Sequence, residues 1–187
     1  MRNSKGFTLV ELMAVIIILG ILLTIAIPNT LSMLERNKKD AYIEDAKKFI
    51  SLSQYLVEKD KKIEKPKDDT SAVVISLKYL NTSDIENSPY ALKYSENLSF
   101  VVLTRHLGRY IYYVNLLACD DPDCNGTDTM GLNVISELDL QQDAVREKIR
   151  RGDVVIDYIS YNALLGKYEA GMHLSNQIDN RAILAVY

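Results

Sequence analysis

The chain has 187 residues, of which 48% are hydrophobic and 25% are charged. This composition is too apolar for a disordered tail protein, and the length suits one ordinary domain with an additional element. The formal net charge is −3, so the overall charge gives no indication of binding to nucleic acid or to an anionic membrane.

The first six residues, MRNSKG, are polar and carry the cations Arg2 and Lys5. In residues 7–27 the only charged side chain is that of Glu11, and 21 helical residues span about 30 Å, the thickness of a hydrocarbon core. This segment is predicted to cross a membrane with its cationic end in the cytoplasm and the rest of the chain outside. No small-residue cleavage site of the secretory kind follows it, so the apolar segment is predicted to be retained.

The stretch KGFTLVELMAVIIILGILLTIAIP resembles the amino terminus of type IV prepilins and of the related pseudopilins of type II secretion and competence systems. The resemblance implies that a prepilin peptidase cleaves after Gly6 and that Phe7, the new amino terminus, is methylated. It also implies an assembly role for Glu11, the fifth residue of the mature chain. Gly20 and Pro28 match positions where many pilins have glycine and proline, which implies that the helix between them loosens during assembly.

Glu11 would lie in hydrocarbon, where an unpaired ionised group costs about 2.5–3.5 kcal/mol. In staggered copies of the chain, Glu11 of one subunit can pair with the freed α-amine of Phe7 of a neighbour, and this pair would fix the register. The alternative is that Glu11 snorkels to the headgroups, because it lies within two turns of the cytoplasmic face. For Pro28 the alternative is that it marks the membrane exit.

After Pro28 the apolar residues recur mostly at spacings of three and four, which predicts that the helix continues to about residue 60 with one buried face. The members of this face are Leu31, Leu34, Tyr42, Ile43, Ala46, Phe49, Ile50, Ser53, Leu56 and Val57. Pro66 then ends any helix. A second short helix is predicted over residues 69–80, although its β-branched residues also permit a strand.

Two runs rich in β-branched and aromatic residues, LSFVVLT and RYIYYVNLLAC, flank RHLG and predict an antiparallel hairpin whose turn is helped by Gly108. Residues 131–138 predict a further strand, and residues 139–151 a helix capped by Asp139 and stopped by Gly152. Strands are also predicted over residues 153–161 and 181–187. The fold class is therefore α+β, a long helix packed on an antiparallel sheet as in type IV pilins.

The predicted organisation has four parts. They are a cytoplasmic leader (1–6), a transmembrane and filament-core helix (7–28), the amphipathic half of the helix with a linker (29–66), and an extracellular head domain (67–187).

Cys119 and Cys124 lie close together in CDDPDC and predict a short disulfide loop if the head leaves the cytoplasm. Free thiols and metal ligation are the alternatives. A zinc site that also uses His106 and His173 is not expected, because the cysteine spacing is wide and the histidines are not clustered.

The stretch DPDCNGTDT matches the beginning of a calcium-binding loop, in which oxygen side chains alternate around a glycine turn. The candidate ligands are Asp121, Asp123, Asn125, Thr127 and Asp128. The match fails at its twelfth position, where Leu132 stands in place of the bidentate acid. An acidic turn held by the disulfide is therefore the favoured interpretation, calcium is the alternative, and no other cofactor is expected.

Four cations stand close together near residue 150: Arg146, Lys148, Arg150 and Arg151. They are interpreted as a solvated helix end, since aromatic residues are not interleaved and the net charge is negative, so nucleic acid is not an expected partner. No serine-hydrolase, metalloprotease or phosphate-loop motif is present, and the chain is predicted not to be an enzyme.

The resemblance implies a structural subunit of a type IV pilus that acts in adhesion and twitching motility. Its partners would be copies of itself, other pilins, the prepilin peptidase, the pilus assembly platform and, before assembly, the membrane. The precursor would be a single-pass membrane protein and the assembled subunit extracellular. The alternatives are a pseudopilin of a type II secretion or DNA-uptake system and a signal-anchored extracytoplasmic binding domain.

Overall fold

A computed structural model describes residues 8–80, 85, 87–96, 98–121, 124, 128–141, 143–152 and 182–187. The chain divides into two compact units between Lys38 and Lys39. Its elements in order are α1 (Leu9–Lys59), β1 (Ser71–Ser76), η1 (Leu77–Tyr79), β2 (Lys93–Tyr94), β3 (Phe100–His106), β4 (Arg109–Cys119), β5 (Thr129–Ser136), η2 (Asp139–Gln141), α2 (Val145–Lys148), β6 (Ile149–Arg151) and β7 (Ala182–Val186).

The predicted long helix is confirmed as α1, which has 51 residues and includes Pro28. In the first unit its large apolar side chains are exposed in every direction, with exposed fractions from 47% at Val15 to 75% at Leu9. Among the described residues, this helix is the one long and apolar enough to cross a membrane by length and composition. A helix that is apolar on all sides requires an apolar environment around it, either lipid or protein.

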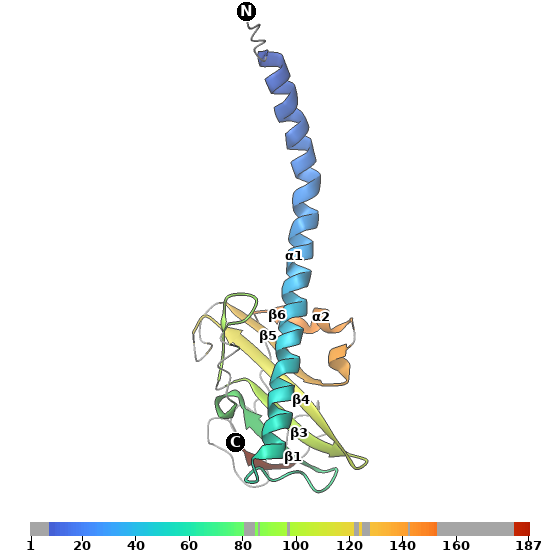
Figure 1. Cartoon of the computed structure of the whole chain (residues 1–187), viewed down its shortest axis with the longest axis vertical. Helices are drawn as coiled ribbons and strands as arrows, with labels where there is room; N and C mark the ends of the chain where they lie inside the picture. The colour runs from blue at the N-terminus through green and yellow to red at the C-terminus, as the bar shows by residue number, and fades with distance from the viewer. Residues whose placement is uncertain are drawn as a thin grey trace, which may run out of the picture. The chain divides into compact units, whose positions relative to one another are not determined.

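In the second unit one face of α1 packs on a sheet (Figure 1). The predicted face is confirmed over residues 42–57, where its buried members are Tyr42, Ile43, Ala46, Phe49, Ile50, Ser53 and Val57. Leu31 and Leu34 were wrongly included, since they are 60% and 51% exposed. They belong to the first unit, in which the structure describes only the helix.

The sheet has the strand order β6-β5-β4-β3-β1-β7, with β2 beside β4. Its pairs are antiparallel except that β7 runs parallel to β1, so the sheet is mixed where an entirely antiparallel one was predicted. Among the described strands, β6 and β7 occupy opposite edges of the sheet, so β7 is not the hairpin partner of β6 and its direction is not set by a turn with that strand. The strand predicted over residues 181–187 is confirmed as β7.

The predicted hairpin is confirmed as β3 and β4, in which His106 pairs with Arg109. The two residues between them, Leu107 and Gly108, have φ values of +48° and +82°. Positive φ at both central positions is the pattern of a type I′ turn, which suits the twist of paired strands. Gly108 adopts this conformation without strain, whereas a leucine rarely does.

The helix predicted over residues 69–80 is wrong, and the permitted alternative, a strand, is the one that forms. Residues 72–75 are completely buried in β1. Val73 and Ile75 belong to the core beneath α1, whereas Ala72 and Val74 belong to a second apolar cluster. A strand that alternates between two apolar clusters is apolar at consecutive positions, and such a run is easily mistaken for a buried helix.

The single helix predicted over residues 139–151 is also wrong, because the chain forms η2, the one-turn α2 and then β6. Ile149 is buried and pairs with Leu132, which fixes the end of this segment as a strand. Gly152, with φ of +81°, therefore follows a strand and stops no helix. The strand predicted over residues 153–161 lies outside the described residues.

Aromatic side chains fill the centre of the core between α1 and the sheet. The Tyr94 ring lies 5.6 Å from the Tyr42 ring and 5.3 Å from the Phe49 ring, measured between centroids. Asp45, a buried carboxylate on α1, accepts a hydrogen bond from the Tyr94 hydroxyl at 2.9 Å and pairs with Lys48 at 3.0 Å. The helix thus carries a buried acid that is satisfied within the core.

We expect the head to unfold in alkali as its core tyrosines ionise. Burial raises the pKa of Tyr42 and Tyr94 well above the usual value and that of Tyr112 to about 12. Unfolded tyrosine ionises near pH 10, so this contribution to stability is complete below about pH 10 and is lost as the pH rises through the folded pKa values. The measurement is tyrosinate absorbance of the full chain in detergent, followed together with circular dichroism.

The chain contains no tryptophan, so tyrosinate absorbance reports these groups directly. The exposed tyrosines should ionise first without loss of structure, and the buried ones only with cooperative unfolding. Ionisation of all tyrosines in one step near pH 10, with the circular dichroism unchanged, would contradict the prediction.

Candidate assembly segment

Glu11 lies in the first turn of α1 and is hydrogen-bonded to Thr8, the residue before the helix. The Thr8 backbone N and Oγ1 donate to Glu11 Oε2 at 2.9 and 2.8 Å, and the Glu11 backbone N donates to Thr8 Oγ1 at 3.3 Å. This reciprocal arrangement is a capping box, which satisfies backbone donors that the first turn of a helix leaves free. This capping box was not predicted, although threonine followed three residues later by glutamate is the ordinary sequence signal of a capping box.

The two processing residues, Gly6 and Phe7, lie outside the described residues. Cleavage after Gly6, methylation of Phe7 and the pairing of Glu11 with a neighbour's amine therefore stay predictions. The capping box adds a constraint on the last of these. The carboxylate that is predicted to meet a neighbour's amine is held at the start of α1 by Thr8.

The helix is continuous through Gly20 and Pro28. Proline has no backbone N–H, so the carbonyl of Thr24 loses its helical donor. Three side chains donate to carbonyls one turn earlier: Thr24 to Gly20 and Ile21, Asn29 to Ile25, and Thr30 to Ala26. Such bonds offer the carbonyls a partner outside the helical ladder and slightly weaken the helix. The predicted loosening is untested, but the segment has the composition that would permit it.

A side chain at position 20 would meet nothing within the chain, because a Cβ built on Gly20 has no heavy atom within 4 Å. The glycine is therefore not required by packing inside the described molecule. Two roles are compatible with this: conformational freedom of the helix and close approach of a neighbouring helix.

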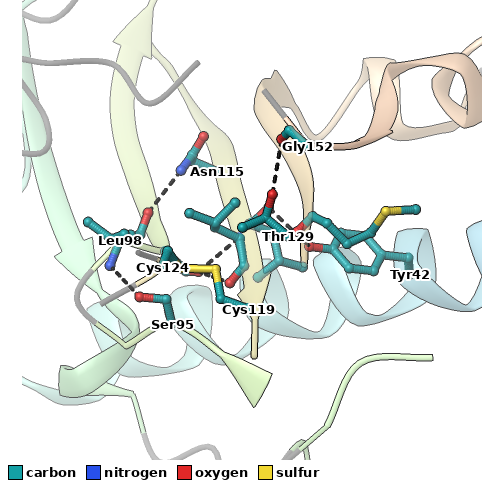
Figure 2. The surroundings of a disulfide bond; sticks show 12 residues. Tyr42, Ser95, Leu98, Asn115, Cys119, Cys124, Thr129 and Gly152 are labelled. Atoms are coloured by element: carbon teal, nitrogen blue, oxygen red, sulfur yellow. Dashed lines mark hydrogen bonds between the residues drawn. A yellow bond between two sulfur atoms is a disulfide. The ribbon is translucent and has the colours of Figure 1, made fainter. Parts of the chain in front are cut away.

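The predicted disulfide is confirmed between Cys119 and Cys124, whose Cα atoms are 5.3 Å apart. The alternatives of free thiols and of cysteine metal ligands are thereby excluded for this pair. Figure 2 shows the bond at the end of β4, beside Leu98 and Asn115. The Asn115 side chain donates to the Leu98 carbonyl at 2.9 Å, which ties the chain before β3 to β4.

Replacing both cysteines, Cys119→Ala together with Cys124→Ala, should lower the free energy of unfolding by about 2 kcal/mol. The closed loop is short, so the bond removes little entropy from the unfolded chain. The measurement is urea unfolding of the full chain in detergent, with the oxidised parent as control. Failure of the double variant to fold would show that the bond is required for the fold and that the loop-entropy argument is insufficient.

The calcium candidates are only partly described, since Asp123, Asn125 and Thr127 lie outside the described residues. Asp128 forms an ion pair with Arg151, with Nε and Oδ1 3.1 Å apart. The backbone carbonyl of Asp121 accepts a hydrogen bond from the Cys124 N–H at 3.0 Å. Within the described part of the chain, no group of three or more histidine, cysteine or acidic side chains is arranged to hold a metal. The charge of Asp128, one of the calcium candidates, is thus balanced by Arg151.

The four cations near residue 150 do not share a helix face. Arg146 lies in α2, whereas Arg150 and Arg151 lie in β6. The Arg146 guanidinium pairs with Asp40 of α1 and, at 2.9 Å, with Asp143. Arg146 therefore ties α2 to the long helix.

Comparison with known proteins relates the chain to one sequence family model and to one characterised protein. The sequence model of the family described as prokaryotic N-terminal methylation motif matches residues 1–27. The type IV wide pilus major component PilA4 of Thermus thermophilus is 47% identical over 57 residues, which make up 29% of this chain and 44% of that protein. The match thus spans less than half of the relative's length. No solved structure matches the chain significantly.

The named relative is a structural component, in agreement with the prediction that this chain is not an enzyme. The methylation motif covers the leader, Glu11 and Gly20 and ends directly before Pro28.

Proposed function

We propose that this chain is a structural subunit of a type IV pilus filament, because the methylation motif at residues 1–27 and the similarity to a type IV pilus component support membership of the type IV pilin and pseudopilin family. The observation that carries the proposal is the first unit of the structure. It consists of a helix that is apolar on every side and has one acid, Glu11, in its first turn.

Such a helix is unsuited to water, since its large side chains from Leu9 to Leu34 are about half exposed or more. Two environments would accept it: the hydrocarbon of a membrane, and the centre of a bundle of identical helices. A filament subunit uses both in turn, first as a membrane-inserted precursor and then as part of the filament core. The head domain would remain on the extracellular side throughout and form the filament surface that acts in adhesion and motility.

Maturation follows from the same segment. A prepilin peptidase removes residues 1–6 by cleavage after Gly6, and the α-amine of Phe7 is methylated; the match to the methylation motif supports both steps. The freed amine then lies four residues before Glu11 of the same chain and, in a staggered arrangement, within reach of Glu11 of a neighbour. Other pilins and the assembly platform are the further partners.

The match to a major pilus component favours a pilus over the short pseudopilus of a secretion or DNA-uptake system. The discriminating experiment is mass spectrometry of the amino-terminal peptide from filaments sheared off the cell surface. A peptide that begins at N-methylated Phe7 in the sheared fraction is expected. If that peptide is found only with the cells, the pseudopilin alternative holds; if it still begins at Met1, the chain is a signal-anchored domain.

A matched pair of leader variants makes the experiment specific. Gly6→Val places a bulky side chain at the cleavage position, and this variant should keep its leader and remain with the cells. Ser4→Ala changes the leader without touching that position, and it should be processed like the parent.

A further inference from the structure

We propose that the turn between β3 and β4 of one subunit docks into an acid-rimmed groove on the head of a neighbouring copy. This inference rests on the proposed function, because it supplies a contact between heads in the filament. The tip is defined as residues 105–109. The groove is defined as the hollow between α1 and residues 137–146.

The tip displays an apolar side chain in an unfavourable conformation. Leu107 is 82% exposed, the highest value among the large hydrophobic side chains that the structure describes, and its φ is +48°. The first central position of this turn type is normally asparagine, aspartate or glycine, which tolerate positive φ. A strained and exposed leucine is doubly unfavourable in an isolated head, and strain of this kind is characteristic of contact and functional sites.

The tip is also held in place from outside the hairpin. The Leu107 backbone N donates to Asp69 Oδ2 at 3.0 Å, and the Arg105 guanidinium donates to the backbone carbonyl of Lys67. Both acceptors belong to the segment that connects α1 to β1. These two bonds fix the turn, so little conformational freedom would be lost when Leu107 is buried by a partner.

The groove has an apolar floor. One part, of about 220 Å³, is lined by Ile50, Leu138 and Leu140 together with Lys47, Gln54 and Glu137. It adjoins a second part, of about 300 Å³, to which Asp40, Glu44 and Asp143 contribute. Leu138 is 63% exposed, so apolar surface is accessible at the mouth of the groove.

The charges of the two surfaces are complementary. The tip flanks Leu107 with the cations Arg105 and Arg109, against one carboxylate, that of Asp69, which accepts from the Leu107 N–H. The groove carries four carboxylates, those of Asp40, Glu44, Glu137 and Asp143. Its two cations pair within it, Lys47 with Glu44 and Arg146 with Asp40 and Asp143, so the carboxylates outnumber the cations by two. Apolar contact with opposite charge at the rim favours a specific orientation and disfavours tip-to-tip contact.

Tip and groove are separate places on one head, so the contact would join different copies. Beside the tip, Tyr110 lies under Lys65, whose Nζ is 5.7 Å from the ring centroid. The groove instead borders residues 40–54 of α1. Figure 1 likewise shows the β3–β4 turn and α2 at different ends of the second unit. A contact between two unlike surfaces of identical subunits leaves one of each surface unused at every end, and it propagates into a helical filament when its rotation does not close a ring.

Cross-linking tests the contact directly. The chain's two native cysteines are joined to each other, so a chain carrying both Leu107→Cys and Leu138→Cys presents only the two introduced thiols. Sheared filaments of this variant, treated with a short bismaleimide, should give a ladder of dimers, trimers and larger species on a denaturing gel. Each single variant is the matched control and should stay monomeric. Absence of a ladder from the double variant would overturn the proposal.

A second measurement separates docking from folding. Leu107→Asn suits the positive φ and removes the apolar side chain, so it should raise the thermal unfolding midpoint of the chain. It should also lower the yield of sheared filaments by about tenfold or more, as expected for loss of a buried leucine. Leu107→Met keeps an apolar side chain and should assemble like the parent. A parent-like filament yield from Leu107→Asn would overturn the proposal, as would reduced attachment to surfaces with the yield unchanged, since the tip would then face an external ligand.

The parent filament preparation distinguishes failure of the proposed function from failure of the docking contact. If the parent gives no sheared filaments beginning at Phe7, the proposed function is wrong. If the parent gives such filaments but the double cysteine variant gives no ladder, only the docking contact is wrong.

Discussion

Glu11→Gln should insert into the membrane like the parent but fail to enter filaments. Glutamine has the shape of glutamate and can accept the same hydrogen bonds from Thr8, so the capping box is retained. What the substitution removes is the negative charge that is proposed to pair with the amine of Phe7 in a neighbouring subunit. Removing one partner of a buried ion pair costs about 3–5 kcal/mol, which corresponds to a loss of at least about 100-fold in association.

Thr8→Val is the matched control for this prediction. It removes the hydroxyl that caps the helix but leaves the charge of Glu11 in place, and loss of a cap costs about 1 kcal/mol. Filament yield from Thr8→Val should therefore fall only slightly. Glu11→Leu removes both the charge and the acceptor of the two hydrogen bonds from Thr8, and it should behave like Glu11→Gln.

The measurement is the amount of chain in the sheared fraction relative to the membrane fraction, at matched expression. The opposite order, with Glu11→Gln assembling normally and Thr8→Val failing to assemble, would show that the carboxylate acts by capping the helix. The charge-pairing mechanism would then be wrong, while the family assignment would stand.

The accuracy of the sequence predictions depended on whether an element was specified by its own residues or by its partners. The helix α1 was predictable because residues 7–27 are continuously apolar and residues 42–57 have helical periodicity. The β3–β4 hairpin was predictable because strand-forming residues flank a short turn that contains Gly108. In both cases the signal is local, and packing agrees with it.

The two wrong helices have a common physical cause. Residues 72–75 and residue 149 are apolar because each meets a neighbouring strand and a packed cluster, and those partners are distant in sequence. The hydrophobic period in a short segment cannot distinguish this from one face of a helix. The parallel position of β7 has the same origin, since it depends on pairing with β1, which is more than 100 residues earlier in the chain.

In the candidate site, the amino-terminal motif and the disulfide were predicted from the sequence. The capping box could have been predicted but was not. The tip and the groove could not be predicted from the sequence. Asp69 and Leu107 are 38 positions apart in the sequence. The positive φ of Leu107 is a property of the backbone, and the presence of a leucine does not predict it. The acid rim is assembled from α1 and from the segment after β5, which no local pattern links.

Tyr42→Ala should lower the free energy of unfolding of the head by about 3–5 kcal/mol, the range for removing a large buried aromatic side chain. Tyr42 is completely buried between α1 and the sheet. Its ring lies 6.2 Å from that of Tyr90 and 5.6 Å from that of Tyr94. A cavity at this position would be lined by aromatic rings that cannot collapse into it without moving the helix.

Tyr42→Phe isolates the contribution of the hydroxyl. That group lies 3.1 Å from the Leu116 carbonyl oxygen in β4 and 3.0 Å from the Met130 carbonyl oxygen in β5. One hydroxyl hydrogen is shared between two acceptors, so a single group ties α1 to two adjacent strands. Its loss should cost about 1–3 kcal/mol, because the acceptors stay buried without this donor.

Tyr55→Phe is the control, since Tyr55 lies on the same helix and is 58% exposed. The free energy of unfolding of this variant should match that of the parent. All three variants are compared by urea unfolding of the full chain in detergent. Equal effects of Tyr42→Phe and Tyr55→Phe would show that the shared hydrogen bond contributes nothing to the attachment of the helix. If Tyr42→Phe is destabilised as expected, its filaments should also break under milder shear. Tyr42 is one of the contacts that join the sheet to α1, so its loss should let the sheet of a pulled head separate from the helix more easily.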